Sequence, residues 1–84
     1  MAISGRLNEV LQKVRPEVSV PIIVEVTGDP AQASGVLRSV GMSIKYTSKT
    51  LPLIYGSGNS GVIQAIASQG FVREISYDEP TYAL

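Results

Sequence analysis

The sequence predicts one α+β domain built on a four-stranded antiparallel sheet. Its 84 residues are enough for a single domain. Three segments place apolar residues at the spacing of an amphipathic helix, and four others alternate apolar and polar residues or are rich in β-branched ones. They follow in the order helix, then β-α-β-β-α-β, which is the ferredoxin-like split β-α-β plan with an extra N-terminal helix.

The first helix is expected over residues 4–15, where Ser4 caps the start and Pro16 ends the element. Its apolar stripe follows the spacing i, i+3, i+4, i+7 and consists of Leu7, Val10, Leu11 and Val14. Residues 20–27 form the clearest strand, because β-branched residues dominate them. Period-two alternation gives that strand one apolar face, made of Ile22, Val24 and Val26.

The second helix begins with Asp29 as its N-cap and Pro30 at its first position, and Gly41 supplies its stop. Its apolar stripe consists of Ala33, Val36, Leu37 and Val40. Gly35 inside this helix either weakens it by about 1 kcal/mol relative to alanine or permits close packing against the sheet.

Two strands are expected next, at residues 42–49 and 51–55, and the glycines of "GSGN" predict a turn after them. Alternation divides the first of these strands into a face with Met42, Ile44 and Tyr46 and a face with Ser43, Lys45 and Thr47. Pro52 indicates an edge or a bulge in the second.

The third helix is expected over residues 60–70, with Ser60 or Asn59 as its N-cap and Gly70 at its end. Its buried stripe consists of Val62, Ile63, Ile66 and Ala67. The last strand, residues 71–77, alternates between Phe71, Arg73, Ile75 and Tyr77 on one face and Val72, Glu74 and Ser76 on the other. The second and third helices would cover one sheet face and leave the other to solvent or a partner.

Composition excludes several classes of function. Seven basic and seven acidic residues balance, so nothing draws the chain to nucleic acid or to an anionic membrane surface. The absence of cysteine and histidine removes disulfides, thiolate metal sites and the commonest metal ligand, so we expect no metal and no cofactor. No apolar run approaches the roughly 20 residues of a membrane span, and the start has no apolar signal-peptide region.

Catalysis is not expected either. The serines have no imidazole to activate them, and pairing with Lys45 or Lys49 is disfavoured because each is expected on the exposed sheet face. Asp78 and Glu79 are adjacent, so in an extended segment they point to opposite sides. "GSGNSG" lacks the lysine of a phosphate-binding loop. RNA recognition by this fold plan requires a basic surface beside its aromatic residues, and this chain has none.

The stretch "VEVTGDPAQASGVLRSVGMSIKY" resembles the opening of ACT-type regulatory domains, which bind small amino acids at a dimer interface. Their usual Asp-Pro-Gly is Asp29-Pro30-Ala31 here, and helix-start chemistry also explains these residues. An ACT-like small-molecule module is therefore the alternative interpretation.

The pattern from Val20 to Leu84 resembles the propeptide domain of subtilisin-like serine proteases and the free-standing inhibitors related to it. "VPIIVEVTG" is similar to that family's opening strand, and "VIQAIASQGFVREISYDEP" to its last helix and strand. The resemblance covers about three quarters of the chain and leaves out residues 4–15. It implies an intramolecular chaperone, an inhibitor, or both, acting on a subtilisin-like protease.

The resemblance also implies roles for residues near the end of the chain. The open sheet face would pack on two protease helices, and Asp78 would cap their N-termini. Glu74 and Glu79 are the second candidates for this role, and Ser76 would make a weaker contact as a neutral acceptor. Pro80 would stiffen a leader to a tail that occupies the substrate cleft as an added strand. That tail consists of Thr81, Tyr82, Ala83 and Leu84, with Leu84 in the primary specificity pocket.

On this interpretation residues 1–19 are an N-terminal helix and connector, 20–79 the propeptide-like domain and 80–84 the tail. The free domain would be a monomer. It would be extracellular if it is a propeptide whose signal peptide was removed, and intracellular otherwise. A plainer interpretation stays open, in which "TYAL" is an arbitrary end after an edge strand.

Overall fold

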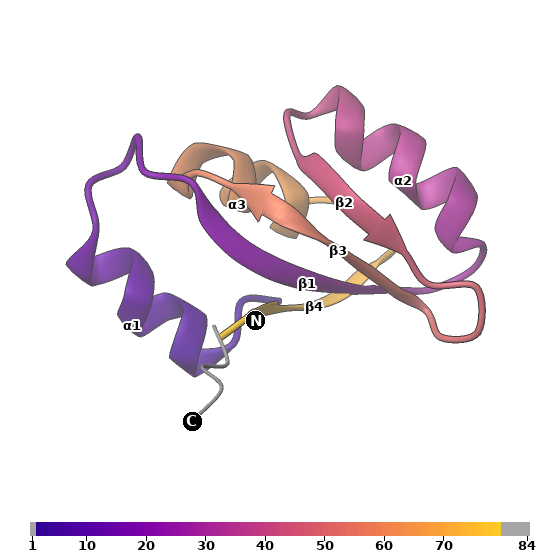
Figure 1. Cartoon of the computed structure of the whole chain (residues 1–84), viewed down its shortest axis with the longest axis horizontal. Coiled ribbons are helices and arrows are strands. Elements are labelled where there is room, and N and C mark those ends of the chain that lie inside the picture. The colour runs from indigo at the N-terminus through magenta and orange to yellow at the C-terminus, as the bar shows by residue number, and fades with distance from the viewer. Residues whose placement is uncertain (1, 80–84) are drawn as a thin grey trace.

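The computed structural model describes residues 2–79 and confirms the α+β fold (Figure 1). Its elements are α1 (Gly5–Lys13), β1 (Val20–Val26), α2 (Pro30–Ser39), β2 (Ser43–Thr47), β3 (Leu53–Gly58), α3 (Ser60–Ala67) and β4 (Val72–Tyr77). The sheet order is β2-β3-β1-β4, and each neighbouring pair is antiparallel. This is the strand order of the ferredoxin-like plan with an additional helix before it.

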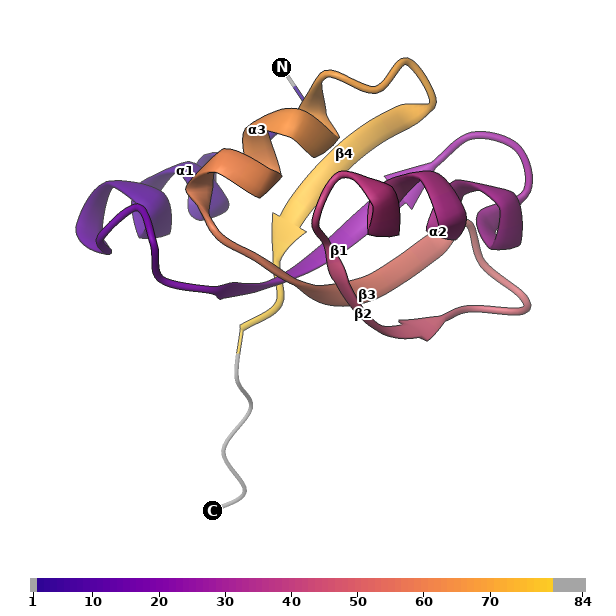
Figure 2. The ribbon, with the colours of Figure 1, turned by 90° about the horizontal axis from the view of Figure 1, so that it is seen from above.

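The helices leave one face of the sheet uncovered. α2 packs against β2 and β3, and α3 packs against β3 and β4. Figure 2 shows both helices on the same side of the sheet. α1 contacts β4 at the edge of the sheet. Within the described residues no helix lies on the opposite face, which we call the open face.

The core lies between the sheet and the helices. Val24 of β1 stands in register with Ile54 of β3 and Ile75 of β4, and all three side chains are fully buried. Leu7 of α1 is also fully buried, so the helix outside the family resemblance belongs to the same core. The other buried apolar residues are Val20, Ile22, Val26, Ala33, Leu37, Met42, Ile63 and Ile66.

The predicted helix starts are confirmed by side-chain caps. Ser4 Oγ accepts a hydrogen bond from the Leu7 amide at 3.2 Å. Asp29 Oδ1 and Asn59 Oδ1 accept from amides two and three residues later, at 3.0 and 2.9 Å. Each cap satisfies a donor that the first helical turn cannot pair internally.

The predicted helix ends are less accurate. α1 ends at Lys13 and α3 at Ala67, so Pro16 and Gly70 lie beyond the ends they were expected to mark. Gly41, at φ +107°, follows α2 as predicted. A Cβ added at Gly35 would meet nothing within 4 Å, so close packing is not the reason for that glycine.

The predicted faces of β2 are wrong beyond Ile44. The register between β2 and β3 shifts between Ile44 and Tyr46, which makes Lys45 the extra residue of a β-bulge. Tyr46 therefore turns to the open face and is 54% exposed. Thr47 turns toward the helices instead, where its hydroxyl lies 2.8 Å from that of Ser34 in α2.

A second bulge makes the predicted faces of the last strand partly wrong. The register between β1 and β4 shifts between Glu25 and Val26, so that Val26 pairs with Val72 and Glu25 with Glu74. Arg73 is skipped in the pairing, and Val72 joins the helix-facing side. The expected alternation holds for Ile75 and fails for Val72 because one inserted residue reverses the side to which a strand residue points.

The predicted turn at "GSGN" is also wrong, because β3 continues through Gly58. A Cβ at Gly56 would collide with the main-chain carbonyl oxygen of Ser43, and a Cβ at Gly58 would lie 2.7 Å from Val62 Cγ1. These glycines therefore allow β2 and α3 to approach the strand closely, and they do not mark a turn.

Candidate functional site

The open face carries both polar and apolar side chains. Strand alternation and register assign to it Ile23, Glu25, Ser43, Tyr46, Leu53, Tyr55, Ser57, Glu74 and Ser76. Ile23 of β1 stands between Tyr55 of β3 and Ser76 of β4. An antiparallel sheet with one free face is usually polar there, so the exposed Tyr46 and the half-buried Tyr55 are the unusual feature.

Two tyrosines stand side by side on the part of this surface formed by β2 and β3. Tyr46 pairs with Tyr55 across β2 and β3, with ring centroids 5.9 Å apart and an interplanar angle of 42°. Together with Lys45 and Asp78 they line a hollow of about 260 Å³. The hollow combines aromatic walls with one positively and one negatively charged group. This combination matches a partner surface that offers both apolar and polar contacts.

Asp78 lies directly after β4 and continues the strand pairing. Its amide donates a hydrogen bond to the Pro21 carbonyl at 3.0 Å, which holds the backbone against β1. The Asp78 side chain lines the hollow of the open face. Within residues 2–79, no hydrogen bond or ion pair joins its carboxylate to another side chain.

The other predicted capping residues, Glu74, Glu79 and Ser76, all form hydrogen bonds within the chain. Ser76 Oγ donates to the Glu74 carboxylate at 3.2 Å. Arg6 Nε donates to the Glu79 carboxylate. This hydrogen bond, together with the charge of Glu79, raises the pKa of the Arg6 guanidinium above its ordinary value. The structure thus separates Asp78 from the three other predicted capping residues.

The four tail residues predicted to enter a protease cleft, Thr81, Tyr82, Ala83 and Leu84, lie outside the described residues. Their roles stay predictions.

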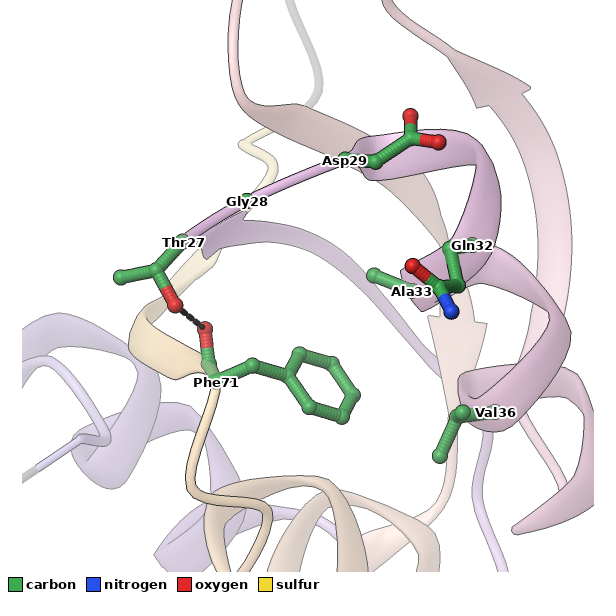
Figure 3. A pocket seen from close by; sticks show the side chains of 7 residues that line it. All are labelled: Thr27, Gly28, Asp29, Gln32, Ala33, Val36 and Phe71. Atoms are coloured by element: carbon green, nitrogen blue, oxygen red, sulfur yellow. Dashed lines mark hydrogen bonds between the residues drawn. The ribbon is translucent and has the colours of Figure 1, made fainter.

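A second hollow lies beside the turn between β1 and α2 (Figure 3). Its volume is about 260 Å³, and its lining residues are Thr27, Gly28, Asp29, Gln32, Ala33, Val36 and Phe71. The Thr27 amide and hydroxyl both donate to the Phe71 carbonyl, at 2.8 and 3.3 Å, and fix this turn to the start of β4. Gly28 permits the turn through its φ of +79°. The Asp29 carboxylate already caps α2, which leaves it one oxygen for a ligand.

Residues 2–79 also bear on metal binding, membrane crossing and the activation of a serine by lysine. They contain no group of three or more His, Cys, Asp and Glu side chains that could hold a metal ion. None of the helices that the structure describes is both long and apolar enough to cross a membrane. No hydrogen bond pairs Lys45 or Lys49 with a serine in this part of the chain.

Sequence reasoning missed Tyr46 and Arg6. Alternation along the sequence predicts Tyr46 on the side of Ile44, and no feature of the composition signals the bulge that reverses this side. Arg6 contacts a residue 73 positions away, and its place on the polar side of α1 carries no sign of that partner.

No protein-family model matches the chain, and a search of curated proteins finds no significant match.

Proposed function

We propose that this chain is a non-enzymatic, propeptide-like domain that binds a subtilisin-like serine protease as its chaperone, its inhibitor, or both. The observation that carries the proposal is the open face. In residues 2–79 no helix covers it, and it presents Tyr46, Tyr55 and the Asp78 carboxylate, which has no side-chain partner among these residues. In this proposal, the face packs on two helices of the protease.

Chemical complementarity supports this partner. A helix N-terminus presents unpaired amides and a partial positive charge, so a free carboxylate stabilises it. The Asp78 carboxylate meets this need, and the tyrosine pair beside it offers aromatic area of the kind enriched at binding hot spots. In the proposal, residues 81–84 add a strand in the substrate cleft, with Leu84 in the primary specificity pocket.

The test is inhibition of a subtilisin-like protease by the full chain and by a variant lacking residues 81–84. We expect the deletion to raise the inhibition constant about thirtyfold or more, because it removes both the main-chain strand and its leucine anchor. A protease-refolding assay with the same two proteins separates the chaperone role, since that role depends on the open face and should largely survive the deletion.

The ACT-like alternative is favoured by one observation, the hollow beside Asp29, Val36 and Phe71, where a small amino acid could be held. Thermal melting in the presence of single amino acids tests it. A rise in melting temperature that Val36→Asp abolishes, together with no inhibition of any subtilisin-like protease, supports the alternative and contradicts the protease proposal.

A further inference from the structure

The N-terminal segment lies along the outer edge of β4 (Figure 1). Ile3 forms a parallel bridge with Ile75. The Ser4 amide donates to the Ile75 carbonyl at 2.9 Å, and the Ile75 amide donates to the Ala2 carbonyl at 2.7 Å. These bonds attach residues 2–4 to the strand that precedes the predicted tail.

Arg6 continues this contact past the end of β4. Its guanidinium carbon lies 5.8 Å from the centroid of the Tyr77 ring, and its Nε donates to the Glu79 carboxylate. The N-terminal segment therefore contacts alternate residues 75, 77 and 79, two positions beyond the last residue of the strand. Leu7, fully buried beside Arg6, anchors the start of α1 in the core.

We infer that residues 2–6 are a clamp, with Arg6 as its positioning residue, that orders the chain through Glu79 before a protease is bound. This inference rests on the proposed function, in which residues 81–84 enter the protease cleft. Fixing the point from which those residues depart lowers the conformational entropy that binding must remove. The clamp lies in the part of the chain that the family resemblance does not cover.

The clamp also gives the two adjacent carboxylates, Asp78 and Glu79, different roles. Glu79 is held by Arg6 inside the chain, whereas Asp78 faces the hollow without a side-chain partner in the described residues. Asp78 then contacts the protease, and Glu79 positions the chain. The opposite assignment, in which Glu79 also binds the protease, makes the opposite prediction for an Arg6 variant, because losing Arg6 would free Glu79.

The test compares inhibition constants of Arg6→Gln, Glu79→Gln and the double variant against a subtilisin-like protease. We expect each single variant to weaken inhibition about two- to fivefold, since the pair is solvent-exposed, and the double variant to weaken it no further. The matched control is Arg15→Gln, which removes the same charge from an exposed arginine whose nearest carboxylate, on Glu17, is 3.9 Å away. It should leave inhibition unchanged.

Salt gives a second criterion. The effect of Arg6→Gln should shrink between about 0.01 M and 1 M salt, because the screening length falls from about 30 Å to about 3 Å. Asp78→Asn should weaken inhibition at least about tenfold, more than Glu79→Gln does.

A protease-free measurement keeps this inference separate from the proposed function. Backbone ¹⁵N order parameters of residues 78 and 79 should fall in Arg6→Gln and Glu79→Gln and stay unchanged in Arg15→Gln. Equal order in Arg6→Gln and Arg15→Gln overturns the clamp. Lower order with unchanged or stronger inhibition overturns its positioning role. If the wild-type chain inhibits no subtilisin-like protease, the positioning role fails together with the inhibitor part of the proposed function, and the order parameters alone decide whether the clamp exists.

Discussion

The rings of Tyr46 and Tyr55 stand opposite each other on the open face, with centroids 5.9 Å apart and an interplanar angle of 42°. They meet because the bulge at Lys45 turns Tyr46 away from the helices. A tilted aromatic pair presents apolar area together with two hydroxyl groups, and it loses little conformational entropy on binding because each side chain has few rotatable bonds.

Tyr46→Ala is expected to weaken protease binding at least about tenfold, because it removes half of this aromatic pair. The free energy of unfolding should fall by only about 1 kcal/mol, since 54% of the side chain is already exposed. Inhibition and urea denaturation measure the two effects. Val36→Ala is the control, because Val36 is 38% exposed on α2, on the other side of the sheet. Stronger loss of inhibition in the control than in Tyr46→Ala contradicts binding through the open face.

Leu84→Asp should nearly abolish inhibition, because the charge would be desolvated in an apolar specificity pocket. Leu51→Asp is the matched control, since Leu51 is 54% exposed in the connection between β2 and β3. It should leave the inhibition constant within about threefold of the wild type. If Leu84→Asp and Leu51→Asp both change the inhibition constant only slightly, Leu84 does not enter that pocket.

Gly56→Ala should destabilise the fold by about 2–3 kcal/mol or more, because the new methyl group would collide with the β2 backbone at Ser43. Gly35→Ala is the paired variant. Its methyl group would meet nothing within 4 Å, so it should stabilise α2 by about 0.5–1 kcal/mol. Chemical denaturation measures the free energy of unfolding of both variants. If both changes have the same sign, the close approach of β2 to β3 at Gly56 is contradicted.

Leu7→Ala should lower the free energy of unfolding by about 2–5 kcal/mol, because it leaves a cavity where a fully buried side chain packs on the sheet edge. Asn8→Ala, an exposed change in the same helix, should alter it by no more than about 0.5 kcal/mol. If both variants unfold at the same denaturant concentration, α1 does not belong to the core in solution.

The sequence predicted local features of this fold well. Ser4, Asp29 and Asn59 are caps whose chemistry acts within one helical turn, so neighbouring residues suffice to identify them. The buried face of β1 could also be predicted from the sequence, because strict alternation of β-branched residues has one physical interpretation when a single face of the sheet is covered.

The features that the sequence did not predict depend on contacts between distant segments. The bulges at Lys45 and Arg73 each add a single residue, which changes the side to which later residues point without any change in composition. Gly56 and Gly58 were assigned to a turn because glycine is common there, whereas their role is to admit a neighbouring strand and helix. The link from Arg6 to Glu79 joins opposite ends of the chain, so no local pattern carries it.

The N-terminal segment also affects whether the sheet edges of two molecules of this protein can pair. A sheet edge with free amides and carbonyls is a template for pairing with another molecule. On β4, residues 2–4 already pair with Ile75, and on β2 the bulge at Lys45 interrupts the regular spacing and exposes a charged side chain. Within residues 2–79, neither edge offers a long, straight run of free hydrogen-bonding groups. We therefore expect the folded chain to resist edge-to-edge pairing into continuous sheets and fibres.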